Sequence, residues 1–260
     1  MNLIVLLKQV PSTESFVSVG EDKKSVKTED VKWVINPYDE FAVEEALKIK
    51  EAMGGTVTIL TVGNDKAVEA VRTALAMGAD NGILINDPDA YNCDGAGISK
   101  ILAAALKNME YDLIIAGQRA VDNDNYYVGA ATAELLNIPH ISMVIKEEIT
   151  DKTIKCTKTI EGGSLVFEAK LPALITTQRG LNEPRYASLP GIMKAKKKPL
   201  DTKTLADIGI NAADLGEPML TIKEVKKPPQ REAGVMIQGD SPSEQAAALV
   251  KALHQEAKVI

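Results

Sequence analysis

The segment Thr56–Gly78, TVTILTVGNDKAVEAVRTALAMG, contains a complete strand, loop and helix. Thr56–Val62 is an apolar run of strand length, which is typical of a parallel strand covered on both faces. Gly63-Asn64-Asp65 then leads into a helix that continues through Met77 and is closed by Gly78. A strand followed directly by a helix predicts an α/β domain built around a parallel sheet.

The same alternation recurs through the first half of the chain. Further strands are predicted at Leu3–Leu7, Gly82–Ile85 and Leu113–Ala116, and helices from Asn36-Pro37-Tyr38-Asp39 to Gly54-Gly55, at Ile98–Leu106 and at Asn125–Leu136. Short connections with right-handed crossovers follow from such a pattern. The predicted fold class is therefore α/β, with an open, mostly parallel sheet and helices on both faces.

Hairpins interrupt this alternation. A polar segment at Val17–Val34 has the pattern of a hairpin, and Thr153–Thr159 and Leu165–Lys170 flank the turn Glu161-Gly162-Gly163 as a second one. Ala173–Thr177 is one more apolar run and predicts a last buried strand.

Beyond Thr177 the sequence becomes rich in Pro, Lys and Gly, and we expect loops until a final helix at about Ser243–Glu256. The predicted organisation is a core domain at 1–222 and a C-terminal arm at 223–260.

Composition limits the classes of function. The chain has 260 residues, of which 45% are hydrophobic and 25% charged, as in ordinary globular proteins. A formal net charge of −6 argues against general nucleic-acid binding, which needs a basic surface. No apolar stretch is long enough to span a bilayer, and Met1-Asn2 runs straight into LIVLLK without a leader, so we expect a cytoplasmic protein.

Metal and disulfide sites are not expected. Cys93 and Cys156 lie far apart in the sequence and lack metal-ligand spacing, and His140 and His254 are isolated. No Ser/His/Asp or Cys/His set and no paired carboxylates stand out, so no self-sufficient enzyme is expected.

Polar or glycine-rich loops follow four of the predicted strands. They are Leu7-Lys8-Gln9, Val34–Asp39, Val62-Gly63-Asn64 and Gly117–Gly129. Ligands of open α/β sheets bind at the carboxyl ends of the strands, where helix N-termini offer backbone N–H groups to a phosphate. An adenine nucleotide is the expected ligand. Neither GxGxxG nor GxxxxGK[ST] is present, which disfavours a dinucleotide-binding dehydrogenase and a P-loop NTPase.

The loop Gly117–Asn125 contains more Asp and Asn than helix capping needs. Asp122, Asn123, Asp124 and Asn125 are interpreted chiefly as ribose and phosphate contacts. A metal site is disfavoured because no third carboxylate or histidine lies nearby in the sequence. Capping alone remains the other alternative.

The segment Asn182–Lys198, NEPRYASLPGIMKAKKK, has the character of a docking loop. Leu189 stands between Ser188 and Pro190, next to the cationic run Lys194–Lys198. An exposed leucine beside steering charges suits an anchor for a protein partner. The alternative is a solvated loop whose charges keep it off other surfaces.

At these residues the chain resembles the β subunits of electron-transferring flavoproteins. The matching segments are Lys8–Pro11, Asn36–Tyr38 with Ala42–Ala46, Arg72–Asp80, Gly117–Gly129, Leu171–Thr176, Leu181–Lys198 and Pro228–Gly234. Together they run nearly from end to end, and NEPRYASLP, MKAKKK and PPQREAG are highly specific.

The resemblance implies an adenine-nucleotide α-hydrolase-like fold and a heterodimer. The α subunit would hold the redox-active FAD, the β subunit would bind a structural AMP, and the C-terminal arm would embrace the α subunit. Electrons would arrive from acyl-CoA dehydrogenases and leave towards a membrane quinone oxidoreductase, with no catalytic residues of the β subunit's own.

The resemblance also assigns residues to these roles. The nucleotide site would comprise Leu6, Lys8, Asn36, Pro37, Tyr38, Asp39, Val62, Gly63, Gly117, Gln118, Arg119, Ala120, Val121, Asp122, Asn123, Asp124, Asn125, Tyr126, Tyr127 and Val128. Tyr38 would approach the flavin. Docking would involve Glu183, Arg185, Tyr186, Leu189 as the anchor, Pro190, and the lysines Lys194 and Lys197, which match lysines that can be methylated in some members.

One departure from the family pattern concerns the ligand. The ordinary loop reads DDDxNQTG, while electron-bifurcating members read DGDTAQVG and bind a second FAD instead of AMP. Asp122–Gly129 reads DNDNYYVG, which is neither. Tyr126 and Tyr127 replace the usual polar pair and could partly close the phosphate end or stack on an adenine. AMP is still favoured, because NEPRYASLP is the loop of non-bifurcating members.

Three other functions remain open at this point. One is an electron-bifurcating β subunit that binds a second FAD and uses NADH. Another is a non-redox nucleotide-binding signalling protein of related fold, which would have no use for the last third of the chain. An ATP-pyrophosphatase-like enzyme is disfavoured, because no SGGxDS-type loop follows the first strand.

Overall fold

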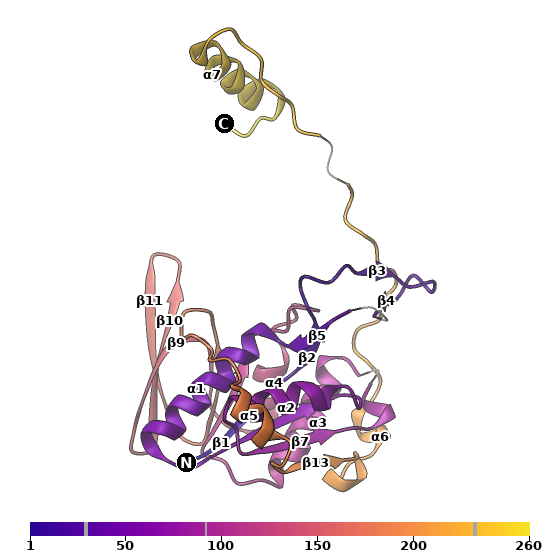
Figure 1. Ribbon diagram of the computed structural model, residues 1–260, viewed down its shortest axis with the longest axis vertical. Coiled ribbons are helices and arrows are strands. Elements are labelled where there is room, and N and C mark those ends of the chain that lie inside the picture. Colours follow the sequence, from indigo (N-terminus) through magenta and orange to yellow (C-terminus); the bar gives the residue numbers. More distant parts are fainter. Residues whose placement is uncertain (29–30, 92, 231–232) are drawn as a thin grey trace. The chain divides into compact units, whose positions relative to one another are not determined.

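The computed structural model describes residues 1–28, 31–91, 93–230 and 233–260, and nine strands of these parts form one sheet (Figure 1). The strand order is β11-β10-β9-β12-β8-β1-β6-β7-β13. The bounds are β1 (Asn2–Leu6), β6 (Thr56–Val62), β7 (Asn81–Ile85), β8 (Leu113–Gly117), β9 (His140–Thr150), β10 (Thr153–Ile160), β11 (Gly163–Lys170), β12 (Ala173–Thr177) and β13 (Leu200–Lys203).

The central strands of the sheet are parallel, and their carboxyl ends lie at the same edge in register. Leu6 of β1 lies opposite Leu60 of β6 and Ala116 of β8. β12 and β7 extend the parallel pairing on the two sides, and only the β9–β10–β11 pairs are antiparallel. The predicted fold class is confirmed.

Helices cover both faces of this sheet. One face carries α1 (Pro37–Met53), α2 (Ala67–Met77) and the short α5 (Leu189–Ala195); the other carries α3 (Gly95–Lys107) and α4 (Val128–Leu136). Because strand side chains alternate between faces, Leu3 and Val5 pack beneath α1 and α2 while Ile4 and Leu6 pack beneath α3 and α4. The four apolar residues that follow Asn2 in β1 therefore reflect burial on both faces.

Loops were expected after Thr177, and that expectation is wrong in two places. α5 forms within the proposed docking loop, because Ser188 accepts the Gly191 N–H as its N-cap and Pro190 suits the first turn. β13 pairs in parallel with β7 and closes that edge of the sheet. Short helical turns η1 (Pro88–Ala90), η2 (Ala206–Ile208) and α6 (Ala212–Leu215) complete the larger unit.

The structure also adds a strand that the sequence pattern did not predict. β9 lies between β12 and β10 and carries the predicted hairpin of β10 and β11. The Val17–Val34 segment contains β3 (Ser18–Val19) paired with β4 (Val26–Lys27), and it ends within β5 (Trp33–Ile35), which pairs with β2 (Gln9–Pro11). Residues 29 and 30 of this segment lie outside the described residues.

The chain divides into two compact units, Met1–Glu224 and Val225–Ile260. In the second unit the predicted final helix is present as α7 (Pro242–Lys251), continued by η3 (Ala252–Glu256) and capped by Ser241. Residues 231 and 232 of the PPQREAG motif lie outside the described residues. No helix in the described ranges is long and apolar enough to cross a membrane.

Candidate functional site

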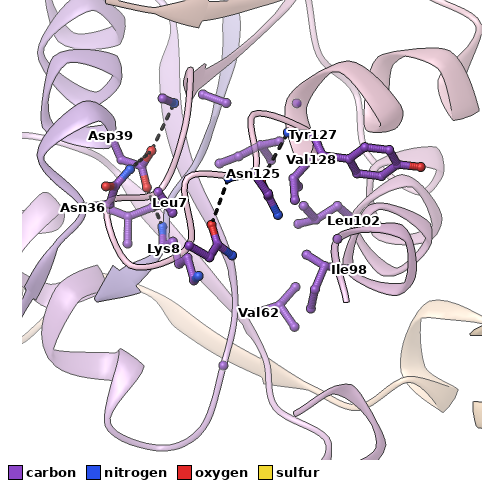
Figure 2. A pocket seen from close by; sticks show the side chains of 18 of the residues that line it. Leu7, Lys8, Asn36, Asp39, Val62, Ile98, Leu102, Asn125, Tyr127 and Val128 are labelled. Carbon is purple, nitrogen blue, oxygen red and sulfur yellow. Dashed lines mark hydrogen bonds between the residues drawn. The ribbon is translucent and has the colours of Figure 1, made fainter. Parts of the chain in front are cut away.

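A cavity of about 390 Å³ opens at the carboxyl ends of β1, β6 and β8 (Figure 2). This volume lies in the range of small-molecule sites, and the position is the usual one for ligands of open α/β sheets. The predicted residues that line it are Leu6, Lys8, Asn36, Asp39, Val62, Gly63, Gly117, Gln118, Arg119, Ala120, Asn123, Asn125, Tyr127 and Val128.

Asp39 joins the two strands that frame the cavity. Its carboxylate accepts the backbone N–H of Lys8 at 2.7 Å and of Gly117 at 3.0 Å, and the Asn36 amide at 2.9 Å. Burial raises the pKa of Asp39 to about 7, against the opposing effect of these three donors. A Cβ on residue 117 would overlap the Asp39 carboxylate, so only glycine permits this contact. Asp39 thus holds the strand ends in place.

The Asn36 side chain holds the loop that follows β8 through two hydrogen bonds to its backbone. It precedes α1 but makes no side-chain cap to that helix. Its Nδ2 instead donates to the Arg119 carbonyl at 2.8 Å, and its Oδ1 accepts the Val121 N–H at 3.2 Å. The NPYD motif is therefore a positioning device for this loop.

Both cations at the cavity are paired with carboxylates of the loop itself. Lys8 Nζ lies 2.6 Å from Asp122, and Arg119 lies 2.8 Å from Asp124. Arg119 Nη2 also donates to the Tyr38 hydroxyl at 2.8 Å, and its guanidinium lies over the rings of Tyr38 and Tyr126 at 4.8 and 5.5 Å. Asp122 and Asp124 consequently neutralise the cations that sequence reasoning assigned to the ligand.

The six remaining predicted residues do not line the cavity. They are Pro37, Tyr38, Val121, Asp122, Asp124 and Tyr126. Asp124 and Tyr126 adopt positive φ values of 48° and 53°, which turn the loop sharply and delay the start of α4 to Val128. The helix predicted at roughly Asn125–Leu136 therefore begins three residues later than that approximate start.

The cavity ends against the first turn of α4. Tyr127 is the N-cap of this helix but makes no side-chain cap. Figure 2 shows its ring directed away from Lys8 and Val62. The ring packs beside Gly95, where an added Cβ would lie 3.0 Å from Tyr127 Cδ1 and 3.1 Å from Asn125 Nδ2. The tyrosine therefore does not fill the space in front of the helix N-terminus.

Sequence reasoning missed one wall of the cavity. Ile98 and Leu102 of α3 line it together with Leu60 of β6. The sequence did carry a signal for this wall, because Asp94-Gly95 opens a helix after β7. Asp94 accepts the N–H groups of Ala96 and Gly97 as the N-cap of α3.

The docking segment, defined as Asn182–Lys198, lies over α1 and α2. Tyr186 and Leu189 expose 97% and 80% of their surface, and Glu183, Pro190, Lys194 and Lys197 are exposed as well. Arg185 differs, since its guanidinium bonds to Glu44 and Glu51 of α1. Among the described residues, no three His, Cys, Asp or Glu side chains cluster as a metal site would require.

The fold defines an open α/β domain with a cavity at its strand ends. The family model described as the electron transfer flavoprotein domain matches residues 24–208. The chain is 45% identical over 261 residues to the electron transfer flavoprotein subunit beta of Bacillus subtilis (strain 168), covering 100% of both chains.

More distant relatives carry the same description. The subunit beta of Syntrophomonas wolfei is 37% identical, with 100% of this chain and 98% of the relative covered. That of Homo sapiens is 35% identical, with 92% and 93% covered. This chain belongs to the electron transfer flavoprotein β-subunit family, as its motifs predicted.

Proposed function

We propose that this chain is the β subunit of a heterodimeric electron-transferring flavoprotein and holds a structural AMP in the strand-end cavity. FAD, held mainly by an α subunit, supplies the redox chemistry when bound. Electrons arrive from acyl-CoA-type dehydrogenases and pass to a membrane quinone oxidoreductase. The chain's own residues bind the nucleotide, position the loops around it and dock the partner protein.

The observation that carries the AMP assignment is the uncapped N-terminus of α4 at the cavity wall. Val128 and Gly129 line the cavity, and Tyr127 makes no side-chain cap, so among the described residues no side chain accepts the first-turn N–H groups. A helix N-terminus in this state favours a phosphate. The apolar side chains of Leu60, Ile98 and Leu102 suit the flat face of an adenine at the other side.

Charge does not distinguish the two ligands, because the phosphate monoester of AMP and the diphosphate bridge of FAD each carry close to two negative charges at neutral pH. Lys8 and Arg119, the cations among the described residues that line the cavity, are already paired with Asp122 and Asp124. AMP is preferred to a second FAD because the docking segment reads NEPRYASLP, as in non-bifurcating members of the family.

The exposed apolar residues support the two docking roles. Leu189 stands at the start of α5 with Tyr186 and Met193 exposed nearby, which suits an anchor for a dehydrogenase. In the second unit Val235 and Met236 are exposed, which suits an arm that contacts the α subunit.

Nucleotide release from the purified heterodimer tests this function. The protein is co-expressed with its α subunit, denatured, and its supernatant is separated by chromatography. One FAD and one AMP per heterodimer is the expected result. Two FAD and no AMP, with flavin reduction by NADH, would identify a bifurcating protein instead. A stable monomer without any flavin partner would favour the signalling alternative.

A further inference from the structure

The docking segment is exposed at its centre but tied down at both ends. Tyr186, Leu189 and Met193 are largely open to solvent, whereas Asn182 and Arg185 reach α1 and Lys198 reaches α2 through the Leu75 carbonyl. Such an arrangement presents apolar side chains without leaving the backbone free to move.

Arg185 makes the tie to α1. Its Nε and Nη2 donate to the two oxygens of Glu44 at 2.8 and 2.9 Å, and its Nη1 donates to Glu51 at 2.5 Å. The Arg185 backbone N–H donates to Glu44 as well, at 3.1 Å. Glu44 and Glu51 lie about two helical turns apart on one face, so a single guanidinium spans both. Asn182 Nδ2 adds bonds to Glu45 at 2.6 Å and to the Phe41 carbonyl at 3.0 Å.

The other end is held by hydrogen bonds in both directions between α2 and the end of the docking segment. Arg72 of α2 donates to the carbonyls of Ala195 and Lys198 at 2.6 and 2.7 Å. Lys198 Nζ in turn donates to the carbonyls of Leu75 and Ala79 at 3.0 and 2.5 Å. Arg72 thus satisfies carbonyls at and just beyond the C-terminal end of α5, and Lys198, three residues after α5, does the same for α2. Positive charge is favoured at such helix ends.

These contacts divide the cations of the docking segment into two groups. Arg185 and Lys198 are half-buried and bonded within the protein. Lys194, Lys196 and Lys197 are exposed, and none of them forms an ion pair with another described residue. A partner can reach the three lysines directly, but it can reach the Arg185 guanidinium only by displacing Glu44 and Glu51.

We propose that Arg185 is a positioning residue of the docking segment, which acts through Glu44 and Glu51, and is not a charge that the partner reads. This rests on the proposed function, because it assigns a role within dehydrogenase docking. Bidentate, charge-assisted bonds are the strong ones, and ordering the segment before the encounter removes an entropic penalty from binding.

Hydrogen exchange on the heterodimer, without any dehydrogenase, measures the positioning directly. Arg185→Gln and Glu44→Gln should each speed exchange of amides in residues 186–195 by about tenfold or more, since a charge-assisted bond is lost. The matched control Lys197→Gln removes one charge from the same segment and should leave those amides unchanged.

Steady-state reduction by an acyl-CoA dehydrogenase measures the consequence. Arg185→Gln and Glu44→Gln should raise KM for the heterodimer with kcat retained, and the double variant should be no worse than either single one. The salt dependence of kcat/KM should stay as in the parent for Arg185→Gln. It should weaken for Lys197→Gln, because an exposed lysine steers the encounter.

Two results would overturn the proposal. One is a raised KM in Arg185→Gln with unchanged exchange; the other is a Glu44→Gln variant that behaves as the parent in both measurements. If Glu44→Gln fails to fold, Glu51→Gln serves as the carboxylate variant in both measurements, because the Glu51 side chain is 58% exposed. If no dehydrogenase reduces even the parent heterodimer, the proposed function fails, while the exchange data still decide the anchoring.

Discussion

Asp39 and Gly117 meet at the point where β8 leaves the sheet. The Asp39 carboxylate accepts the Gly117 N–H at 3.0 Å, and a Cβ on residue 117 would overlap that carboxylate and lie 2.8 Å from the Tyr38 carbonyl carbon. The same carboxylate holds Lys8 at the end of β1. One buried side chain therefore sets the distance between two walls of the cavity.

Gly117→Ala should destabilise the protein by about 1–3 kcal/mol, since an overpacked backbone contact must be relieved by movement of α1. We also expect less AMP to be retained. Urea unfolding and nucleotide release measure the two effects. Gly163→Ala is the matched control, because its added Cβ would meet nothing within 4 Å. Equal midpoints for the two variants would show that the Asp39–Gly117 contact tolerates a methyl group.

Tyr127→Gln restores the polar residue that the ordinary family loop carries at this position. Because the tyrosine ring points away from the cavity and packs beside Gly95, we expect AMP retention to change by less than about threefold, under 1 kcal/mol. Calorimetric titration of AMP into nucleotide-stripped heterodimer measures it. A tenfold change in affinity would mean that the tyrosine, and not the helix N-terminus, shapes the site.

The sequence pattern predicted strands best where both faces of the strand are buried. β6 and β12 were predicted with their observed bounds because both faces of each strand are covered. β9 was missed because one face of HISMVIKEEIT is exposed in its second half and carries charge. β13 is a four-residue edge strand, LDTK, which is too short to stand out in the sequence. It is recognised as a strand through its pairing with the edge of β7.

Long-range pairing limited the prediction of the site. The strand-end rule indicated most of the loops that line the cavity. Nothing local, however, indicates that Lys8 pairs with Asp122 across 114 positions, or that Arg185 pairs with Glu44 across 141. Lys8 and Arg185 were assigned to the nucleotide and to the partner because the resemblance to the family placed them there.

Glu147 should make stability depend on pH. Burial, and then its contact with the Glu45 carboxyl, raises the pKa of Glu147 from 4.5 to about 7. A carboxyl whose pKa is raised in the folded state contributes its full stability below pH 4.5 and loses it as pH rises through 7. We expect a loss on the order of 1–2 kcal/mol between pH 5 and 8, after allowance for solvent screening.

Glu147→Gln should reduce that slope to the part contributed by Asp39, whose pKa burial also raises to about 7, so that the variant is more stable than the parent at pH 8 but not at pH 5. Urea unfolding at the two pH values measures the difference. Glu148→Gln is the control, because Glu148 is exposed on the opposite face of β9. A parent whose stability stays constant from pH 5 to 8 would contradict the expected protonation of Glu147.

Leu189→Ala tests the anchor itself. Ser188 caps α5 and Leu189 begins it, with 80% of its surface exposed, so truncation removes an apolar contact without opening a cavity in the protein. We expect unchanged FAD and AMP content and a loss of about 10- to 30-fold in kcat/KM with the dehydrogenase, the range of about 1.4–2 kcal/mol for an anchor residue. Met193→Ala is the matched control, since this residue is 73% exposed on the same helix. If both variants lose the same activity, the partner contacts the apolar surface as a whole. If Leu189→Ala instead loses cofactor, Leu189 packs against the α subunit and the docking assignment is wrong.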